Sequence, residues 1–451
     1  MKRRAAIVAG LLAVLAAGAT PATAATGHSG PLSLRGTHPD GSTYAIEVPE
    51  HWNGTLLSYT PGYGPGAGSG AEAVLAGNTA AQQWLLAHGY ALAGTRPFGD
   101  GWSVEESLRD VPLTVAVFDR VVGRPSVTLA WGASMGGEVA AGLAERRPDV
   151  IDGALPYCGS VAGPVAMQNQ ALDAAFAVTT LLSTPVKLSG FASTGEEAAT
   201  VVAAKSALAQ AQDTPEGRAR IALAAAFAQI SPWSVPGTPE PGPRDWAGQE
   251  AQEYAAFADT AFSPRYPLEQ RAGGPVSWNT GVDYGRELRQ SGRLGQVRAL
   301  YAAAGLDLDA DLARLATAPR IQADPHAVAY LARNFSPEGR LTVPVLTLHA
   351  KGDNFPTVTQ ARAYSDVVAR AGRTALLREA FVDGPGHCTF SGAELVAAVL
   401  TLEHRVKSGN WTGTGAAPLN RLAAALAGGD SGLGGTGFLD LRPDRLLRTY
   451  P

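Results

Sequence analysis

A short motif centred on Ser134 constrains the fold of this chain more than any other feature. The sequence Trp-Gly-Ala-Ser-Met-Gly-Gly follows an apolar run, Ser126–Trp131, and opens a segment with helical spacing, Gly136–Arg146. A G-x-S-x-G sequence between a strand and a helix is typical of a strained turn that presents a serine hydroxyl above a sheet. The helix that begins there directs its positive end toward a developing oxyanion. The motif therefore predicts Ser134 as a nucleophile.

Strand-like and helix-like segments alternate on both sides of a long helical region. Strands that alternate with helices of about 10–15 residues indicate an α/β fold whose mainly parallel sheet is covered by helices on both faces. The expected strands are Ser42–Val48, Thr55–Tyr59, Tyr90–Gly94, Ser126–Trp131, Ile151–Tyr157, Val343–His349 and Ala375–Val382. The expected helices around them are Asn78–His88, Pro112–Val122, Gly136–Arg146, Ser391–Lys407 and Leu419–Ala427.

The long helical region has a different composition. Residues 163–340 are rich in Ala and Leu with helical spacing, as over Ala171–Leu182 and Thr200–Ala226, and contain no convincing strand. We interpret them as a helical cap inserted into the sheet domain. The predicted division is a signal peptide at 1–24, the two parts of the sheet domain at 25–162 and 341–407, the cap at 163–340 and a C-terminal extension at 408–451.

The N-terminal residues predict export. A basic start is followed by an apolar run, Ala5–Ala19, and by Ala-Thr-Ala at residues 22–24, which is the order of a secretory signal. The apolar run is shorter than the roughly 20 residues that a membrane span needs, and no later run is long enough. Cleavage would remove three basic residues and take the formal net charge from −4 to −7. This acidic balance gives no electrostatic reason to expect nucleic acid as a partner.

A serine hydroxyl needs an adjacent base, and the base needs an orienting acid. Four histidines follow Ser134 in the sequence. His387 is the expected base because it lies in a loop after the last predicted strand and before the final helix. His326 lies within the cap, His404 lies on the final helix, and His349 ends a strand where a structural role is the alternative.

Asp353 is the expected acid. It follows a predicted strand whose carboxyl end belongs at the same edge of the sheet as Ser134. Asp383 is the main alternative, but it is only four residues from His387 in the same loop. That short separation makes it difficult for Asp383 to approach the imidazole from the side opposite the serine.

Backbone N–H groups are expected to form an oxyanion hole. One would come from Met135, directly after the nucleophile, and one from the glycine-rich loop after the strand that ends at Tyr59. Pro61 has no N–H to donate, so Tyr63 is the first choice in that loop and Gly62 the second. The alternative is a glycine-rich turn with no part in catalysis. The sequence contains no metal-ligand or nucleotide-binding motif, so neither a metal nor a cofactor is expected.

These motifs resemble those of secreted bacterial α/β-hydrolases of the esterase kind, including the tannase and feruloyl esterase group. The resemblance covers roughly residues 40–160 and 340–407, and rests on the Ser134 motif, on Gly-Asp at 352–353 and on Gly-His-Cys at 386–388. It implies an α/β-hydrolase fold for the sheet domain, into which the large helical cap is inserted, and the cap itself has no motif that we can assign. In the tannase and feruloyl esterase group a cysteine beside the histidine is bridged to one beside the serine, whereas Ala133 occupies that second place here.

Cys158 and Cys388 are the two cysteines of the chain. An even pair in an exported protein predicts a disulfide, and Cys158, at the end of the strand after the Ser134 unit, is the available partner for Cys388. Two separate buried thiols are the alternative.

The sequence therefore predicts a secreted serine hydrolase that cleaves carboxylic esters through an acyl-enzyme. An exopeptidase or an acyltransferase with the same triad is the alternative, and a non-catalytic binding protein is a third. The Ala- and Leu-rich cap lies where ligands bind in open α/β sheets, which favours a small-molecule ester with an apolar or aromatic group.

Overall fold

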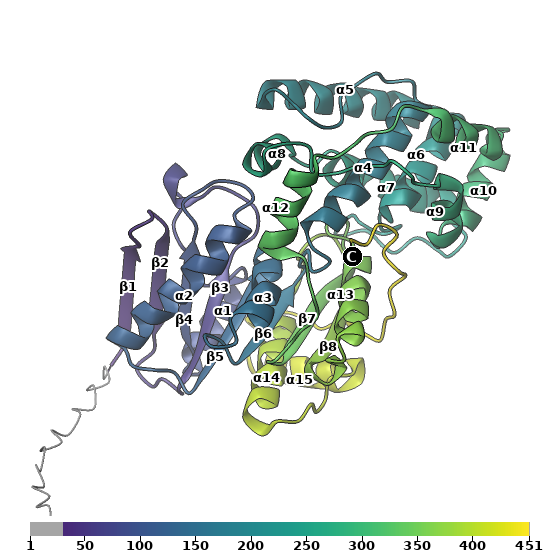
Figure 1. Cartoon of the computed structure of the whole chain (residues 1–451). Helices are drawn as coiled ribbons and strands as arrows, with labels where there is room; N and C mark the ends of the chain where they lie inside the picture. The colour runs from purple at the N-terminus through teal and green to yellow at the C-terminus, as the bar shows by residue number, and fades with distance from the viewer. Residues whose placement is uncertain (1–29, 451) are drawn as a thin grey trace, which may run out of the picture.

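A computed structural model describes residues 30–450, so the predicted signal peptide lies outside the described residues. A nine-stranded sheet forms its centre, in the order β1-β2-β4-β3-β5-β6-β7-β8-β9 (Figure 1). Neighbouring strands from β4 to β8 in this order pair in parallel, while β1, β2 and β9 join the sheet antiparallel. The predicted α/β fold with a mainly parallel sheet is confirmed. The strands are β1 Leu32–Thr37, β2 Thr43–Val48, β3 Thr55–Thr60, β4 Ala91–Arg96, β5 Val127–Ala133, β6 Gly153–Tyr157, β7 Val345–Gly352, β8 Leu377–Pro385 and β9 Phe438–Leu439.

Helices cover both faces of the sheet through apolar side chains. Helices α1, α14 and α15 contribute to one core, and α2, α3 and α13 to the cores on the other face. Helix α2 begins two turns before Pro112, so the predicted start at this proline is wrong. Glu105 and Glu106 in the first turn favour the earlier start, because acidic side chains stabilise a helix N-terminus. The bounds are α1 Thr79–Ala87, α2 Val104–Val121, α3 Met135–Arg146, α13 Thr359–Arg370, α14 Gly392–Ser408 and α15 Ala416–Gly429.

Nine helices between β6 and β7 form the cap in this described part of the chain (Figure 1). Helix α4 is buried along almost its whole length and packs against several other cap helices. The stretch with helical spacing over Thr200–Ala226 belongs to two helices, because Thr214 and Pro215 start a new helix there. The cap helices are α4 Pro164–Leu181, α5 Thr194–Gln212, α6 Pro215–Ala228, α7 Trp246–Ala261, α8 Tyr266–Ala272, α9 Tyr284–Gln290, α10 Leu294–Ala303, α11 Leu308–Thr317 and α12 Pro325–Phe335.

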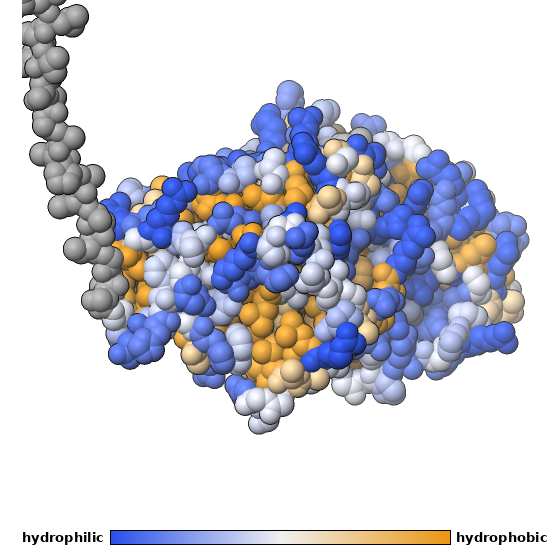
Figure 2. Space-filling model, turned by 90° about the horizontal axis from the view of Figure 1, so that it is seen from below, coloured by the Kyte–Doolittle hydropathy of each residue, from blue (hydrophilic) through white to orange (hydrophobic). Residues whose placement is uncertain are grey.

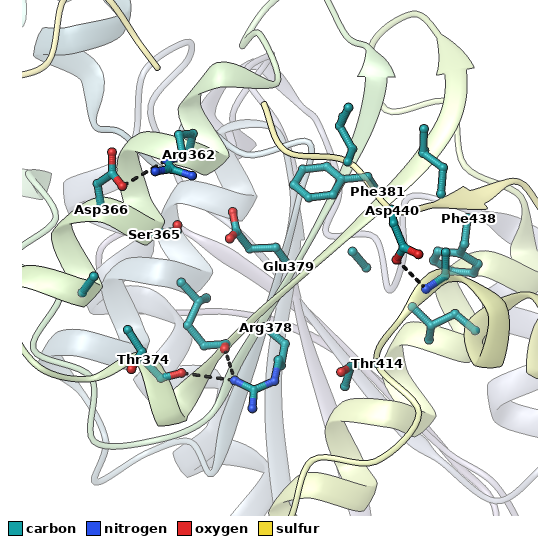
Figure 3. A pocket seen from close by; sticks show the side chains of 17 residues that line it. Arg362, Ser365, Asp366, Thr374, Arg378, Glu379, Phe381, Thr414, Phe438 and Asp440 are labelled. Atoms are coloured by element: carbon teal, nitrogen blue, oxygen red, sulfur yellow. Dashed lines mark hydrogen bonds and ion pairs between the residues drawn. The ribbon is translucent and has the colours of Figure 1, made fainter. Parts of the chain in front are cut away.

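The C-terminal extension first completes the edge of the sheet. Its strand β9 pairs with β8, and a pocket of about 530 Å³ lies between these strands and α13. Figure 3 shows the ion pair of Arg362 with Asp366 in this pocket, with Glu379 nearby on β8 and Asp440 across from it. The side chains that line the pocket include one serine, Ser365, and no histidine. The pocket therefore lacks the serine–histidine pair that the sequence predicts.

The extension then returns to the cap, where the C-terminus lies in Figure 1. Arg448 forms an ion pair with Asp173 of α4 and donates from Nη2 to the carbonyl oxygen of Trp278 at 2.8 Å. Burial raises the pKa of Asp173 to about 6, although Arg448 beside it acts in the opposite direction. The backbone N–H of Leu447 also donates to Gln229 Oε1 at 3.0 Å. These contacts tie the cap to the sheet domain through the C-terminal segment 440–450.

The surface of the sheet domain is mixed in character. Figure 2 shows, on the side of the molecule away from the cap, apolar areas interspersed with hydrophilic side chains. Within residues 30–450, no helix is both long enough and apolar enough to span a membrane.

The ion pair of Arg448 with Asp173 gives a prediction about stability. Arg448→Met removes the cation from a buried carboxylate and should lower the free energy of unfolding by about 3–5 kcal/mol at pH 7.5. Arg35→Met is the control, because Arg35 pairs with Glu72 at the surface and an exposed pair contributes no more than about 1 kcal/mol. Urea unfolding measures both variants. Equal effects of the two substitutions would show that the C-terminal segment does not stabilise the cap.

Candidate active site

Ser134 lies on a sharp turn between β5 and α3. Its backbone has φ 56° and ψ −121°, a region that side-chain-bearing residues rarely adopt. A Cβ on Gly132 would lie 2.2 Å from the carbonyl oxygen of Gly136, and a Cβ on Gly136 would lie 2.0 Å from that of Thr60. Both positions therefore require glycine, and the backbone forms the turn that the motif predicts.

His387 and Asp353 lie side by side. Nδ1 of His387 is 3.0 Å from each carboxylate oxygen of Asp353. Asp353 follows β7 and is fully buried, and it also accepts a hydrogen bond from the backbone N–H of Phe355 at 3.1 Å. Burial lowers the pKa of His387, but the charge of Asp353 and its hydrogen bond outweigh this effect, so the pKa is raised. An imidazole held in this way is suited to accept a proton at Nε2.

The alternatives to these two residues lie elsewhere. Asp383 is 3.4 Å from Lys351 Nζ rather than beside the imidazole. His326 begins α12 in the cap, and His404 is exposed on α14. Neither histidine lines the cavity that contains Ser134.

His349 has a position that the sequence did not reveal. It is buried, its Nε2 donates to the carbonyl oxygen of Pro356 at 3.1 Å, and the same nitrogen is 3.5 Å from Asp353 Oδ2. Burial lowers the pKa of His349 more than Asp353 raises it. A neutral His349 thus lies against the carboxylate that holds His387. The sequence does contain one signal for this contact: His349 and Asp353 are four residues apart across the end of a strand.

Ser134 and His387 face the same cavity, whose volume is about 510 Å³. No hydrogen bond joins their side chains in the described structure, and His387 Nε2 instead lies 3.4 Å from Cys388 Sγ. Catalytic hydrogen bonds are often long without substrate and shorten in the reacting complex.

The candidate oxyanion donors also line this cavity. Met135 opens α3, and its backbone N–H has no acceptor within residues 30–450. Gly62 stands against the nucleophile, since a Cβ placed on it would lie 3.1 Å from Ser134 Cβ. Tyr63 lies beside it in the cavity wall, with its side chain half exposed. The loop after β3 thus lies against the serine through Gly62, and its role as an oxyanion donor stays a prediction.

Cys158 and Cys388 are joined by a disulfide with a Cα–Cα distance of 5.2 Å. Cys158 follows β6, and Cys388 directly follows His387. Both residues have positive φ values, 43° and 57°. The bond therefore attaches the histidine loop to the strand beside the nucleophile, in agreement with the expected pairing.

Aromatic and apolar side chains from both the sheet domain and the cap form most of the cavity wall. The sheet domain contributes the turn at Ser134, the loop after β3 and the loop after β7, while α4, α5, α7 and α8 contribute the cap side. The cap therefore lies over the carboxyl ends of the strands. The apolar and aromatic members are Tyr63, Trp102, Ala133, Met135, Met167, Val201, Ala258, Phe262, Pro264, Leu268, Phe355 and Pro356.

Comparisons with known proteins identify the family. No family model matches the sequence. The chain is 32% identical over 423 residues to an o-phthalyl amidase from Xanthobacter agilis, in an alignment that covers 86% of this chain and 90% of the relative. The chain belongs to the same α/β-hydrolase family as this amidase. It is a hydrolase.

Similar solved structures include two fungal esterases. Feruloyl esterase B from Aspergillus oryzae is 14% identical, with 85% of this chain and 81% of that chain covered and a TM-score of 0.42. Tannin acyl hydrolase from Aspergillus niger is also 14% identical, with 84% and 79% covered and a TM-score of 0.42.

The parts present in this α/β-hydrolase are those that acyl transfer requires. They are a serine on a sharp turn, a histidine oriented by a buried carboxylate, and the candidate oxyanion residues Gly62, Tyr63 and Met135 in the wall of the same cavity. The cap residues that complete the cavity were not predicted, because Ala- and Leu-rich helical spacing looks the same for a core helix and for a helix that lines a substrate site.

The pairing of His387 with Asp353 predicts a pH dependence. A base must be neutral, and the pKa of His387 is raised, so kcat/KM should fall as the pH decreases through a value above 6.5. Asp353→Asn removes the charge that raises this pKa, so the acidic limb should move to lower pH while kcat falls by about 10⁴-fold. Asp383→Asn is the matched control and should change neither. Pre-steady-state acylation measured from pH 5 to 9 reports both effects. The assignment of the acid is wrong if Asp383→Asn lowers kcat and shifts the acidic limb while Asp353→Asn changes neither.

Proposed function

We propose that this chain hydrolyses esters and amides of small aromatic carboxylic acids through an acyl-enzyme on Ser134. The observation that carries the proposal is the aromatic cavity of about 510 Å³, whose wall contains Ser134 and His387, with His387 paired to the buried Asp353. A cavity of this size accommodates a substituted benzoyl group. The family relationship to an amidase supports the inclusion of amides among the substrates.

The reaction follows from the roles of these groups. His387 Nε2 accepts the proton of the Ser134 hydroxyl as its oxygen attacks the carbonyl carbon, and Asp353 stabilises the imidazolium that forms. The N–H groups of Met135 and of the Gly62–Tyr63 loop donate to the oxyanion. His387 then gives the proton to the departing alcohol or amine, and a water molecule releases the acid by the same steps in reverse.

An amide places a greater demand on His387 than an ester. An amine is a poor leaving group, so the proton must reach its nitrogen before the C–N bond breaks. The raised pKa of His387 keeps the imidazolium populated to a higher pH than an ordinary histidine would. The name o-phthalyl amidase refers to an aromatic acyl group and an amide bond, and this supports amides beside the esters that the sequence favours.

Matched substrates test this proposal. p-Nitrophenyl benzoate and benzoyl p-nitroanilide share an acyl group, and alanyl p-nitroanilide represents an exopeptidase substrate. We expect turnover of both benzoyl compounds, a burst of nitrophenol equal to the enzyme concentration, and a loss of about 10⁴-fold or more in Ser134→Ala and His387→Ala. Turnover of alanyl p-nitroanilide alone would favour an exopeptidase. Failure of a fluorophosphonate probe to label the native chain would argue against a serine hydrolase.

We also propose that the chain is exported. The support is the signal-like sequence at 1–24 and the disulfide between Cys158 and Cys388, because such bonds persist in oxidising compartments. Protein recovered from the medium of the source cells should begin at Ala25 and contain no titratable thiol in denaturant. A chain that remains in the cytosol with residues 1–24 attached would contradict export.

A further inference from the structure

The cap side of the cavity contains a buried side chain that has no partner in the protein. Gln168 of α4 lines the cavity and is 2% exposed. Its Oε1 is buried without a hydrogen-bond partner, and no hydrogen bond within residues 30–450 uses its amide nitrogen. A buried amide without partners is unfavourable for folding. Such a group therefore calls for an explanation in terms of something that the cavity binds.

The neighbouring amides on α4 differ from Gln168 in having partners. Asn169 and Gln170 are equally buried, each 2% exposed. Asn169 Oδ1 accepts from the backbone N–H of Trp278 at 2.9 Å, and Gln170 Nε2 donates to Thr357 Oγ1 at 3.0 Å. These two amides attach α4 to another part of the cap and to the loop after β7, whereas the amide of Gln168 contributes to no contact of this kind.

The backbone at Gln168 is held firmly in spite of this. Its carbonyl oxygen accepts a hydrogen bond from Arg265 Nη2 at 2.9 Å, and Arg265 is itself buried. Ser263, two residues before Arg265, lies in the same cavity wall, and its Oγ is also buried without a partner. The cap side of the cavity wall thus carries the amide of Gln168 and the hydroxyl of Ser263, beside the charged side chains of Lys205 and Asp259.

We propose that Gln168, assisted by Ser263, determines acyl specificity by hydrogen bonding to an oxygen substituent on the aromatic ring of the substrate. The inference rests on the proposed function and adds the substrate class to it. An unsubstituted benzoyl group would leave both polar groups unpaired in a desolvated site. A ring hydroxyl can donate to Gln168 Oε1, whereas a ring carboxylate can accept from Gln168 Nε2 and from the Ser263 hydroxyl. Sites with buried hydrogen-bonding groups discriminate strongly against ligands that lack the partner.

The test compares benzoyl p-nitroanilide with its hydroxyl and carboxylate derivatives at the 2-, 3- and 4-positions. The wild-type chain should prefer at least one substituted compound. In Gln168→Met the ratio of kcat/KM, substituted over unsubstituted, should fall by about 10-fold for a hydroxyl and by up to about 100-fold for a carboxylate, mainly through KM. The two series distinguish a neutral from an anionic substituent. A merely structural role for Gln168 would lower both kcat/KM values together and leave the ratio unchanged.

Gln170→Met is the matched control, because it removes an equally buried amide from the same helix. It should lower Tm through the loss of its hydrogen bonds and leave the substrate ratio unchanged, whereas Gln168→Met should leave Tm unchanged or raise it. A wild-type chain that cleaves none of the benzoyl compounds would refute the proposed function. A chain that cleaves them without preference, or a Gln168→Met variant that keeps the preference, would refute the role of Gln168 alone.

Discussion

The close approach of three backbone segments at Ser134 is the constraint on which the site depends. Gly132 at the end of β5, Gly136 in the first turn of α3 and Thr60 at the end of β3 meet at distances that no Cβ could occupy. This contact fixes the nucleophile, the helix N-terminus and the loop of Gly62 relative to one another. Because β3 and β5 are paired neighbours in a parallel sheet buried on both faces, the segments that follow them are held in place before any other part of the site is added.

The base and its acid come from segments that follow the cap insertion, so long-range contacts must place them. Strand β7 pairs with β6 and brings Asp353 to the same edge of the sheet, and the disulfide joins the His387 loop to the end of β6. A Cβ on Gly352 would lie 2.2 Å from the carbonyl oxygen of Trp233. The cap therefore packs directly against the strand end that carries Asp353, and its position and that of the acid are linked.

The sequence predicted those parts of the structure that depend on interactions between residues close together in the chain. The turn at Ser134, the buried strands and the order of serine, acid and histidine follow from short motifs and from hydrophobic periodicity. Strand β1 alternates between half-buried and exposed residues at the sheet edge, and β9 has only two residues, so neither gives a clear pattern. The contact of His349 with Asp353 depends on the bend after β7. The cavity wall depends on how the cap helices pack, which no short segment encodes.

Helix α4 both attaches the cap to the rest of the chain and lines the cavity that contains Ser134. Asp173 binds the C-terminal segment through Arg448, Gln170 reaches Thr357 after β7, and Gln168 faces the cavity. The helix is therefore attached to the last residues of the chain at one point and to the loop beyond Asp353 at another. Since these attachments hold the backbone of α4, the position of Gln168 relative to Ser134 depends on contacts at both ends of the helix. Neighbouring positions of a single helix therefore serve different purposes. The amides of Asn169 and Gln170 have partners in the protein and hold the cap in place, whereas the unpaired amide of Gln168 is available to the substrate.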